Sequence, residues 1–194
     1  AELAVAGGAT LDVTGVNIVI EDAMIAVPNG IFRAQAAGSA TQIAVAPTIE
    51  PTAGDLRVSG GEIGGVNSSI LFGGGRMEFV GAFIGPTDFE GAPFELIIAG
   101  DTLDLSGATF QIGPDELNSL ATMSLFAIND IRLGEATDLF VDGEKPGTTT
   151  DTSLSLSAGR DIAISGETIV ENDNGSNELQ GLFFVDAVTL SLDG

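Results

Sequence analysis

The chain has 194 residues, of which 44% are hydrophobic and 18% are charged, so it is long and apolar enough to fold rather than stay disordered. Its formal net charge of −22 excludes binding to the phosphate backbone of nucleic acids and attraction to anionic lipid. It contains no cysteine and no histidine, which excludes disulfides, thiolate metal sites and histidine-based catalysis.

The sequence begins AELAV, without an initiator methionine, and small residues of this kind flank signal-peptidase cleavage sites. The longest uncharged run, residues 34–49, is too short to span a bilayer and contains polar residues. We therefore expect an exported protein that lies outside the cell or on its surface after signal-peptide removal. We expect no nucleic-acid partner and no insertion into the membrane.

A short phrase recurs along the chain, with the pattern apolar, any residue, apolar, Ser or Thr, Gly, any two residues, apolar. Its clearest copies are LDVTGVNI (11–18), LRVSGGEI (56–63), LDLSGATF (103–110) and IAISGETI (162–169). Weaker copies lie at 34–41, 77–84, 126–134 and 186–193, which makes eight copies with a period of about 25 residues.

Each copy alternates apolar and polar residues, which predicts a β-strand with one buried face. A period of this length without a long helical pattern predicts an all-β fold: a single-domain parallel β-solenoid over residues 1–194, with about eight coils. At about 4.8 Å per coil the rod would be roughly 40 Å long. The expected inward pairs are Leu11/Val13, Leu56/Val58, Met77/Phe79, Leu103/Leu105, Ile131/Leu133, Ile162/Ile164 and Val188/Leu190.

Two further expectations follow from this register. The outward residues between the inward pairs place Arg57 beside Glu78 and Asp104 beside Arg132 on neighbouring coils, where each pair would contribute about 0.2–1 kcal/mol. The glycine that closes each phrase should mark a corner at which the backbone turns tightly.

Three segments depart from the repeat. Residues 114–122 (PDELNSLAT) predict one short helix, because proline followed by acidic residues is typical of a first helical turn. Residues 144–151 and 171–178 are rich in polar and turn-forming residues, which predicts loops that project from the rod.

The second of these loops contains Asp173, Asn174 and Glu178, whose side-chain oxygens could bind calcium. Calcium is the only cofactor that the sequence suggests, and a polar loop without a metal is the alternative. Asp138, Asp142 and Glu144 form a second acidic group, which could bind calcium for the same reason.

The phrases AGRDIAISG, AGDTLDLSG, INDIRLG and AGDLRVSGGEI resemble the repeats of filamentous-haemagglutinin-type proteins. These are large exported β-helical surface adhesins of Gram-negative bacteria and cyanobacteria. The resemblance implies a β-helical, exported protein whose repeats are structural and carry no catalytic residues. Of the family's amino-terminal secretion motif, only the fragment Pro28-Asn29-Gly30 is present.

Right-handed β-helices also include polysaccharide lyases and hydrolases, in which paired carboxylates act as acid and base. Two of the predicted outward carboxylates could form such a pair. The alternative is that all of them belong to a solvated or ion-paired face. These carboxylates are Asp12, Glu62, Glu78 and Asp104. The chain has no Trp and no Tyr to stack on sugars, which weighs against this reading. We expect no enzymatic activity.

A β-solenoid has two open ends with unpaired backbone groups. No capping segment is evident in this sequence, which favours end-to-end stacking of copies into an extracellular filament or surface layer. Candidate self-assembly residues are Leu3, Val5, Val188, Leu190 and Leu192. The expected partner is a second copy of the chain, bound head to tail. A monomeric surface adhesin that binds through its projecting loops is the first alternative, and a β-helical polysaccharide lyase or hydrolase is the second.

Overall fold

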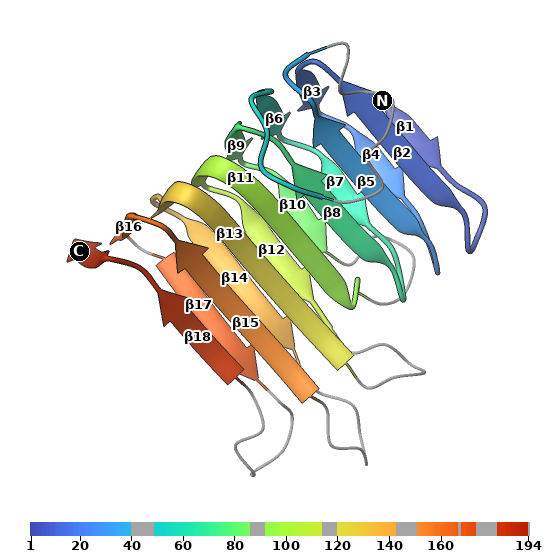
Figure 1. The fold of residues 1–194 in the computed structure, drawn as a ribbon. Helices are drawn as coiled ribbons and strands as arrows, with labels where there is room; N and C mark the ends of the chain where they lie inside the picture. Colours follow the sequence, from blue (N-terminus) through green and yellow to red (C-terminus); the bar gives the residue numbers. More distant parts are fainter. Residues whose placement is uncertain are drawn as a thin grey trace.

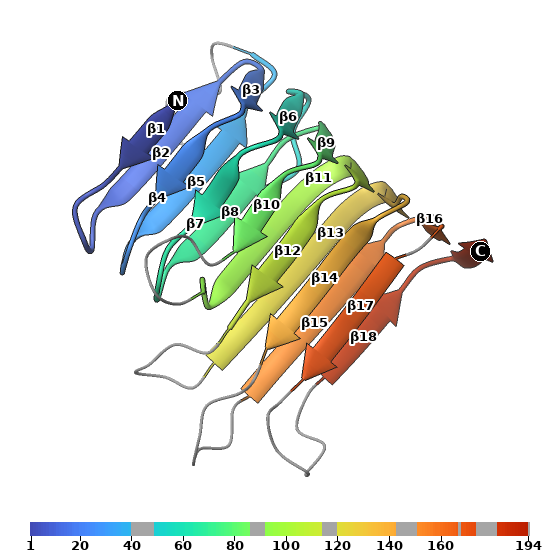
Figure 2. The same cartoon turned by 180° about the vertical axis from the view of Figure 1, so that it is seen from behind.

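The fold is a stack of parallel β-strands. The computed structural model describes residues 1–39, 49–85, 92–113, 120–142, 151–166, 168–173 and 182–193. These residues form 19 strands and no helix, and all of their pairings are parallel. Figure 1 and Figure 2 show the strands stacked in chain order, with the two termini at opposite ends of the stack. The predicted all-β parallel fold is confirmed, and this arrangement is consistent with a solenoid.

The strands form three series, which we call the first, second and third sides of the stack. The first side consists of β2 (Thr10–Gly15), β5 (Ile31–Ala36), β8 (Ser69–Gly73), β11 (Glu95–Ser106), β13 (Leu120–Leu133), β15 (Asp151–Ala158) and β18 (Leu182–Asp186). The second side consists of β3 (Ile18–Glu21), β6 (Leu56–Ser59), β9 (Arg76–Val80), the C-terminal parts of β11 and β13, β16 (Asp161–Ser165) and β19 (Thr189–Asp193).

The third side is a separate seven-stranded sheet, whereas β11 and β13 run from the first side into the second and join those two in one 12-stranded sheet. The third side consists of β1 (Glu2–Ala4), β4 (Met24–Ala26), β7 (Glu62–Gly64), β10 (Phe83–Gly85), β12 (Thr109–Ile112), β14 (Thr137–Asp142) and β17 (Thr168–Asp173).

The core lies between the three sides and is built from inward side chains that align from strand to strand. The best example is a column on the second side that runs through Ile18, Leu56, Met77, Leu103, Ile131, Ile162 and Leu190. The inward pairs predicted on β6, β9, β11 and β13 are all buried, as is Ile162, and Ile164 is partly buried against the core. The period-2 pattern therefore identified the buried face of these strands correctly.

Two parts of the predicted repeat were in the wrong place. The predicted repeat placed Leu11 and Ala34 in the same column as Leu56, but Leu11 and Ala34 lie on the first side. The second-side column begins with Ile18, which is followed directly by Leu56. At the other end, Ile162 and Ile164 align with Leu190 and Leu192, not with Val188 and Leu190. The reason is that each winding of the chain contains several strands with the same apolar alternation. The alternation shows which face of a strand is buried and does not show on which side of the stack that strand lies.

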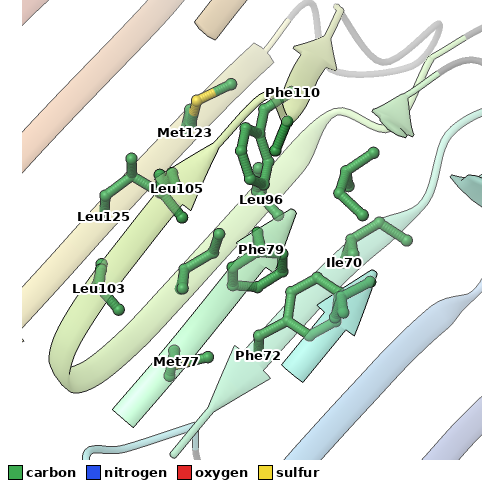
Figure 3. Packing of buried hydrophobic residues seen from close by; sticks show 14 of the residues in the cluster. Ile70, Phe72, Met77, Phe79, Leu96, Leu103, Leu105, Phe110, Met123 and Leu125 are labelled. Carbon is green, nitrogen blue, oxygen red and sulfur yellow. The ribbon is translucent and has the colours of Figure 1, made fainter. Parts of the chain in front are cut away.

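Aromatic rings connect the three sides inside the core. The ring centroids of Phe32 and Phe72 are 5.6 Å apart, those of Phe72 and Phe79 are 5.1 Å apart, and those of Phe79 and Phe110 are 5.5 Å apart. All three contacts are edge-to-face, the geometry that aromatic rings prefer. Figure 3 shows Phe72, Phe79 and Phe110 among the aliphatic side chains of the core. The four fully buried rings come from β5, β8, β9 and β12, so they link strands of all three sides.

The corner that follows the second side is formed by residues with left-handed backbone. The N–H of Gly60 donates to the carbonyl oxygen of Val80 (3.0 Å), and the N–H of Gly81 donates to that of Ser106 (3.1 Å), so successive corners are stacked. The left-handed residues and their φ angles are Asp22 (45°), Gly60 (60°), Gly61 (75°), Gly81 (60°), Gly107 (61°), Ala136 (57°) and Gly166 (72°). This confirms the expectation that Gly60, Gly107 and Gly166, which close three of the clear phrases, mark corners.

Two glycines at this corner allow backbone strain to be separated from crowding. Gly81 (φ 60°) has open space where a Cβ atom would lie, so G81A should cost about 1–2 kcal/mol, the strain of a left-handed alanine. Gly61 (φ 75°) would place its Cβ atom 2.3 Å from the carbonyl oxygen of Ala23. G61A should therefore cost a further 1–3 kcal/mol or so from overpacking, as measured by urea unfolding. Equal losses in the two variants would contradict this account.

The predicted helix is not supported by the residues that can be checked. Residues 114–119 lie outside the described part of the chain, and residues 120–122 belong to β13. Ala121 pairs with Thr152 and Thr122 pairs with Glu95, so strand neighbours on both sides override the local helical pattern. The bounds of the two predicted loops, 144–151 and 171–178, were also partly wrong. Asp151 is the first residue of β15, and residues 171–173 belong to β17.

Candidate functional site

The outward face of the second side carries paired charges. Arg57 Nε lies 3.8 Å from Glu78 Oε2, which confirms the predicted pair. Asp104 aligns with Arg132 as predicted, and it accepts a hydrogen bond from the Ser106 hydroxyl (3.3 Å). Four of the five arginines in the chain lie on this side or directly before one of its strands, namely Arg57, Arg76, Arg132 and Arg160.

The tightest of these ion pairs joins Arg160 to Asp130. Arg160 donates a hydrogen bond from Nε to Asp130 Oδ1 (2.7 Å) and a second one to the other carboxylate oxygen, and Nε also lies 3.6 Å from Asp161 Oδ2. The side-chain hydrogen bond from Arg160 lowers the pKa of Asp130, and the same bond raises the pKa of Arg160. Both side chains reach solvent, so the pair adds modestly to stability.

A pH dependence follows from this pair. Because the pKa of Asp130 in the folded protein is below its ordinary value of 3.8, the stabilisation is fully present above that pH and is lost as the pH falls through the lowered pKa. R160Q should lower the urea midpoint slightly at neutral pH, and its difference from the unmodified protein should shrink in acid. R76Q is the matched control, because the described residues include no ion pair of Arg76. A difference for R160Q that grows in acid would contradict this assignment.

The four carboxylates considered as an acid–base pair do not form one group. Asp12 lies on the first side, 3.3 Å from Arg33, and Glu62 lies on the third side in β7. Only Glu78 and Asp104 are neighbours, on β9 and β11, and each of them already has a partner. The structure therefore supports an ion-paired or solvated role for these residues.

Of the acidic candidates for calcium, Asp138, Asp142 and Asp173 belong to strands of the third side. Asp142 and Asp173 are the last residues of β14 and β17 and are aligned in the sheet, and Asp138 lies within β14. Glu144, Asn174 and Glu178 lie outside the described residues. Within the described ranges no three acidic side chains gather into a group that could hold a metal ion. The fold thus brings the two predicted acidic segments to neighbouring strand ends.

The two ends of the stack are the candidate assembly site. At one end the outer edges of β1, β2 and β3 have no strand partner among the described residues, and at the other end the same holds for β17, β18 and β19. Large apolar side chains are exposed at both ends. They are Leu3, Val16, Val19 and Met24 at the first end and Phe184, Val188, Leu190 and Leu192 at the second.

The five predicted self-assembly residues divide between these ends. Leu3 is exposed on β1, and Val5, which follows β1, is partly buried and donates its N–H to the carbonyl oxygen of Ala26 (3.0 Å). Leu190 and Leu192 lie together on β19, with 50% and 72% of their surface exposed, and extend the inward column of Ile162 and Ile164. Val188 is 80% exposed but precedes the strand, so it does not belong to that column.

Sequence reasoning missed the strand at the other end of the second-side column from Leu190 and Leu192. This strand is β3, in which Ile18 and Ile20 point inward and Val19 points outward with 63% of its surface exposed. The signal was present in residues 16–20 (VNIVI), whose alternation restarts after Gly15. The repeated phrase ends at Ile18, the first residue of β3, so the phrase does not predict this strand.

No protein-family model, curated protein or solved structure matches this chain. Among the described residues, no helix is long and apolar enough to cross a membrane.

Proposed function

We propose that this protein is a β-solenoid that acts as an exported structural subunit, assembled end to end into an extracellular filament or surface layer. The single observation that carries the proposal is that, among the described residues, each side of the stack has an unpaired strand edge at both ends, accompanied by exposed apolar side chains. The resemblance of the repeats to filamentous-haemagglutinin-type adhesins supports export to the cell surface.

Unpaired N–H and C=O groups on a strand edge are a template for pairing with another chain, and proteins usually protect them with charge, proline or a covering segment. Here the edge strand β19 alternates Leu190 and Leu192 with Thr189 and Ser191, and its only charged residue is the last one, Asp193. Burying one such leucine completely is worth about 1.5–3 kcal/mol. A contact between unlike ends does not close on itself, so repeated stacking gives a filament.

Charge opposes this assembly and makes it dependent on salt. Each copy carries a net charge of −22, so copies repel one another at low ionic strength. Added salt shortens the range of this repulsion, to about 10 Å at an ionic strength of 0.1 M. We therefore expect fibres to form more readily as ionic strength rises. If the acidic segments at β14 and β17 bind calcium, calcium should promote fibre formation more strongly than sodium chloride of the same ionic strength. If they do not, the two salts should act equally.

Negative-stain electron microscopy of the purified protein tests the proposal, in low salt, in high salt, and with millimolar calcium against sodium chloride of matched ionic strength. Each side has seven strands in the part of the chain that the structure describes, so stacked copies should give fibres with an axial repeat of about 34 Å, at about 4.8 Å per strand. Isolated short rods under all conditions would overturn the proposal and favour the monomeric adhesin.

A further inference from the structure

The outward face of the second side contains an open hollow of about 300 Å³ over β3, β6 and β9, which Figure 1 and Figure 2 show side by side. Its volume lies at the lower end of the range for small-molecule sites, about 300–1,000 Å³. The hollow faces away from the core, so a strand paired beside β3 would not cover it. The outward residues that line it are Asn17, Val19, Asp55, Arg57, Arg76 and Glu78.

Two opposite charges in this hollow are neighbours that do not bind each other. Leu56 aligns with Met77 in the sheet. The residues directly before them, Asp55 and Arg76, are therefore also neighbours, and both are exposed. Neither the Asp55 carboxylate nor the Arg76 guanidinium forms an ion pair or a hydrogen bond with any residue that the structure describes. Both groups are therefore available to a ligand.

The other lining residues add no net charge. Arg57 and Glu78 already form an ion pair with each other (3.8 Å). The side-chain oxygen of Asn17 accepts a hydrogen bond from the backbone N–H of Asp55 (3.0 Å), which orients the amide and leaves its NH₂ group as a donor. Val19 exposes 63% of its surface and provides an apolar wall. The hollow thus combines an available cation, an available anion and an apolar surface.

We infer that this hollow binds a small zwitterion of the α-amino acid class, whose carboxylate pairs with Arg76 and whose ammonium group pairs with Asp55. A guanidinium donates two parallel hydrogen bonds to a carboxylate, and an ammonium group donates up to three to oxygen acceptors. An aliphatic side chain of the ligand lies against Val19. The inference concerns the outward face of a single copy and does not depend on the proposed end-to-end assembly.

The net charge of the chain favours a zwitterion over a simple ion. At −22 the protein repels a ligand that carries only a carboxylate. A ligand that carries only an ammonium group is attracted to many of the 28 acidic residues and does not select this hollow. A zwitterion has no net charge, and both of its charged groups are satisfied only where an available cation and an available anion are neighbours.

Saturation-transfer NMR with L-alanine as the probe tests this inference at low ionic strength, where ion pairs are screened least. The unmodified protein should bind L-alanine with a dissociation constant in the millimolar range, because both ion pairs would be exposed to solvent. R76Q and D55N should each weaken binding by about fivefold or more, the effect of losing one such pair. Propionate and ethylamine, which each lack one of the two charged groups, should compete about fivefold less effectively than unlabelled L-alanine.

R132Q and D104N are the matched controls. Asp104 and Arg132 are also aligned on the outward face of the second side, but they do not line the hollow. These variants remove the same charges as D55N and R76Q do, and they should bind L-alanine as the unmodified protein does. Urea unfolding of each variant confirms that it is folded before its binding is scored.

The outcomes separate the site from general electrostatic effects. Weaker binding in R76Q and D55N, with normal binding in R132Q and D104N, would support the inference. Equal losses in all four variants would overturn it, because the charge of the whole protein would then explain the binding. Propionate that competes as well as L-alanine would show a simple anion site and overturn the zwitterion. Absence of binding to the unmodified protein would overturn the inference and leave the filament proposal standing.

Discussion

Replacing Phe79 by alanine is expected to destabilise the protein by about 3–5 kcal/mol, the usual cost of deleting a buried phenyl ring. Phe79 is fully buried on β9 and makes edge-to-face contacts with Phe72 (5.1 Å) and Phe110 (5.5 Å). These rings come from all three sides, so the cavity would weaken contacts between the sides as well as within one column. Urea unfolding followed by circular dichroism would measure the loss.

Two controls make this result specific. F79L retains most of the apolar volume and should lose less than F79A does. F184A removes a ring that is about half exposed on β18 and should change the free energy of unfolding by about 0.5 kcal/mol or less. Similar losses from F79A and F184A would show that the aromatic core does not hold the sides together.

Introducing charge at the second of the two proposed assembly ends is expected to prevent the proposed fibre formation without unfolding the protein. Leu190 and Leu192 extend the inward column of the second side, so L190D/L192D would bury two carboxylates in an apolar joint. An unpaired buried charge costs several kcal/mol. Because each 1.4 kcal/mol is a factor of ten in affinity, the protein concentration needed for assembly should rise by about 100-fold or more. Light scattering and electron microscopy would measure this change.

The matched control for this double variant is V188D. Val188 is even more exposed and lies only two residues away, but it precedes β19 and stands outside the inward column. V188D should therefore assemble at nearly the same concentration as the unmodified protein. If V188D were as defective as L190D/L192D, added negative charge rather than the column would explain the loss of fibres.

How much of the fold could be predicted depends on the range of the interactions involved. The burial of Leu103 and Leu105 follows from local alternation, because successive side chains of a strand point to opposite faces. The pair of Arg57 and Glu78 was also predictable, since it requires only the register of two neighbouring phrases. Local pattern and repeat period were sufficient for these features.

Other features depend on parts of the chain that the phrase does not encode. Ile18 and Leu56 are neighbours in the second-side column but lie 38 positions apart in the sequence, well above the period of about 25. A repeat of about 25 residues therefore does not connect them, and the predicted repeat used Leu11, which lies on the first side. The strand at residues 120–122 is held by β11 and β15, which are distant in sequence, against a local helical pattern. The predicted self-assembly residues Val188, Leu190 and Leu192 share only their place near the end of the sequence, whereas the register shows that Leu190 and Leu192 alone continue the column of Ile162 and Ile164.

The parallel pairing of all the described strands also gives the stack a polarity. Two copies that met through the same end would have to align their strands in opposite directions, so the ladder could not continue in its own hydrogen-bond pattern. Any fibre built by continuing the ladder would therefore have a leading and a trailing end with different chemistry. A variant such as L190D/L192D could still be added through its intact β1–β3 end and would then block the next addition. Small amounts of it should poison the growth of fibres formed by the unmodified protein.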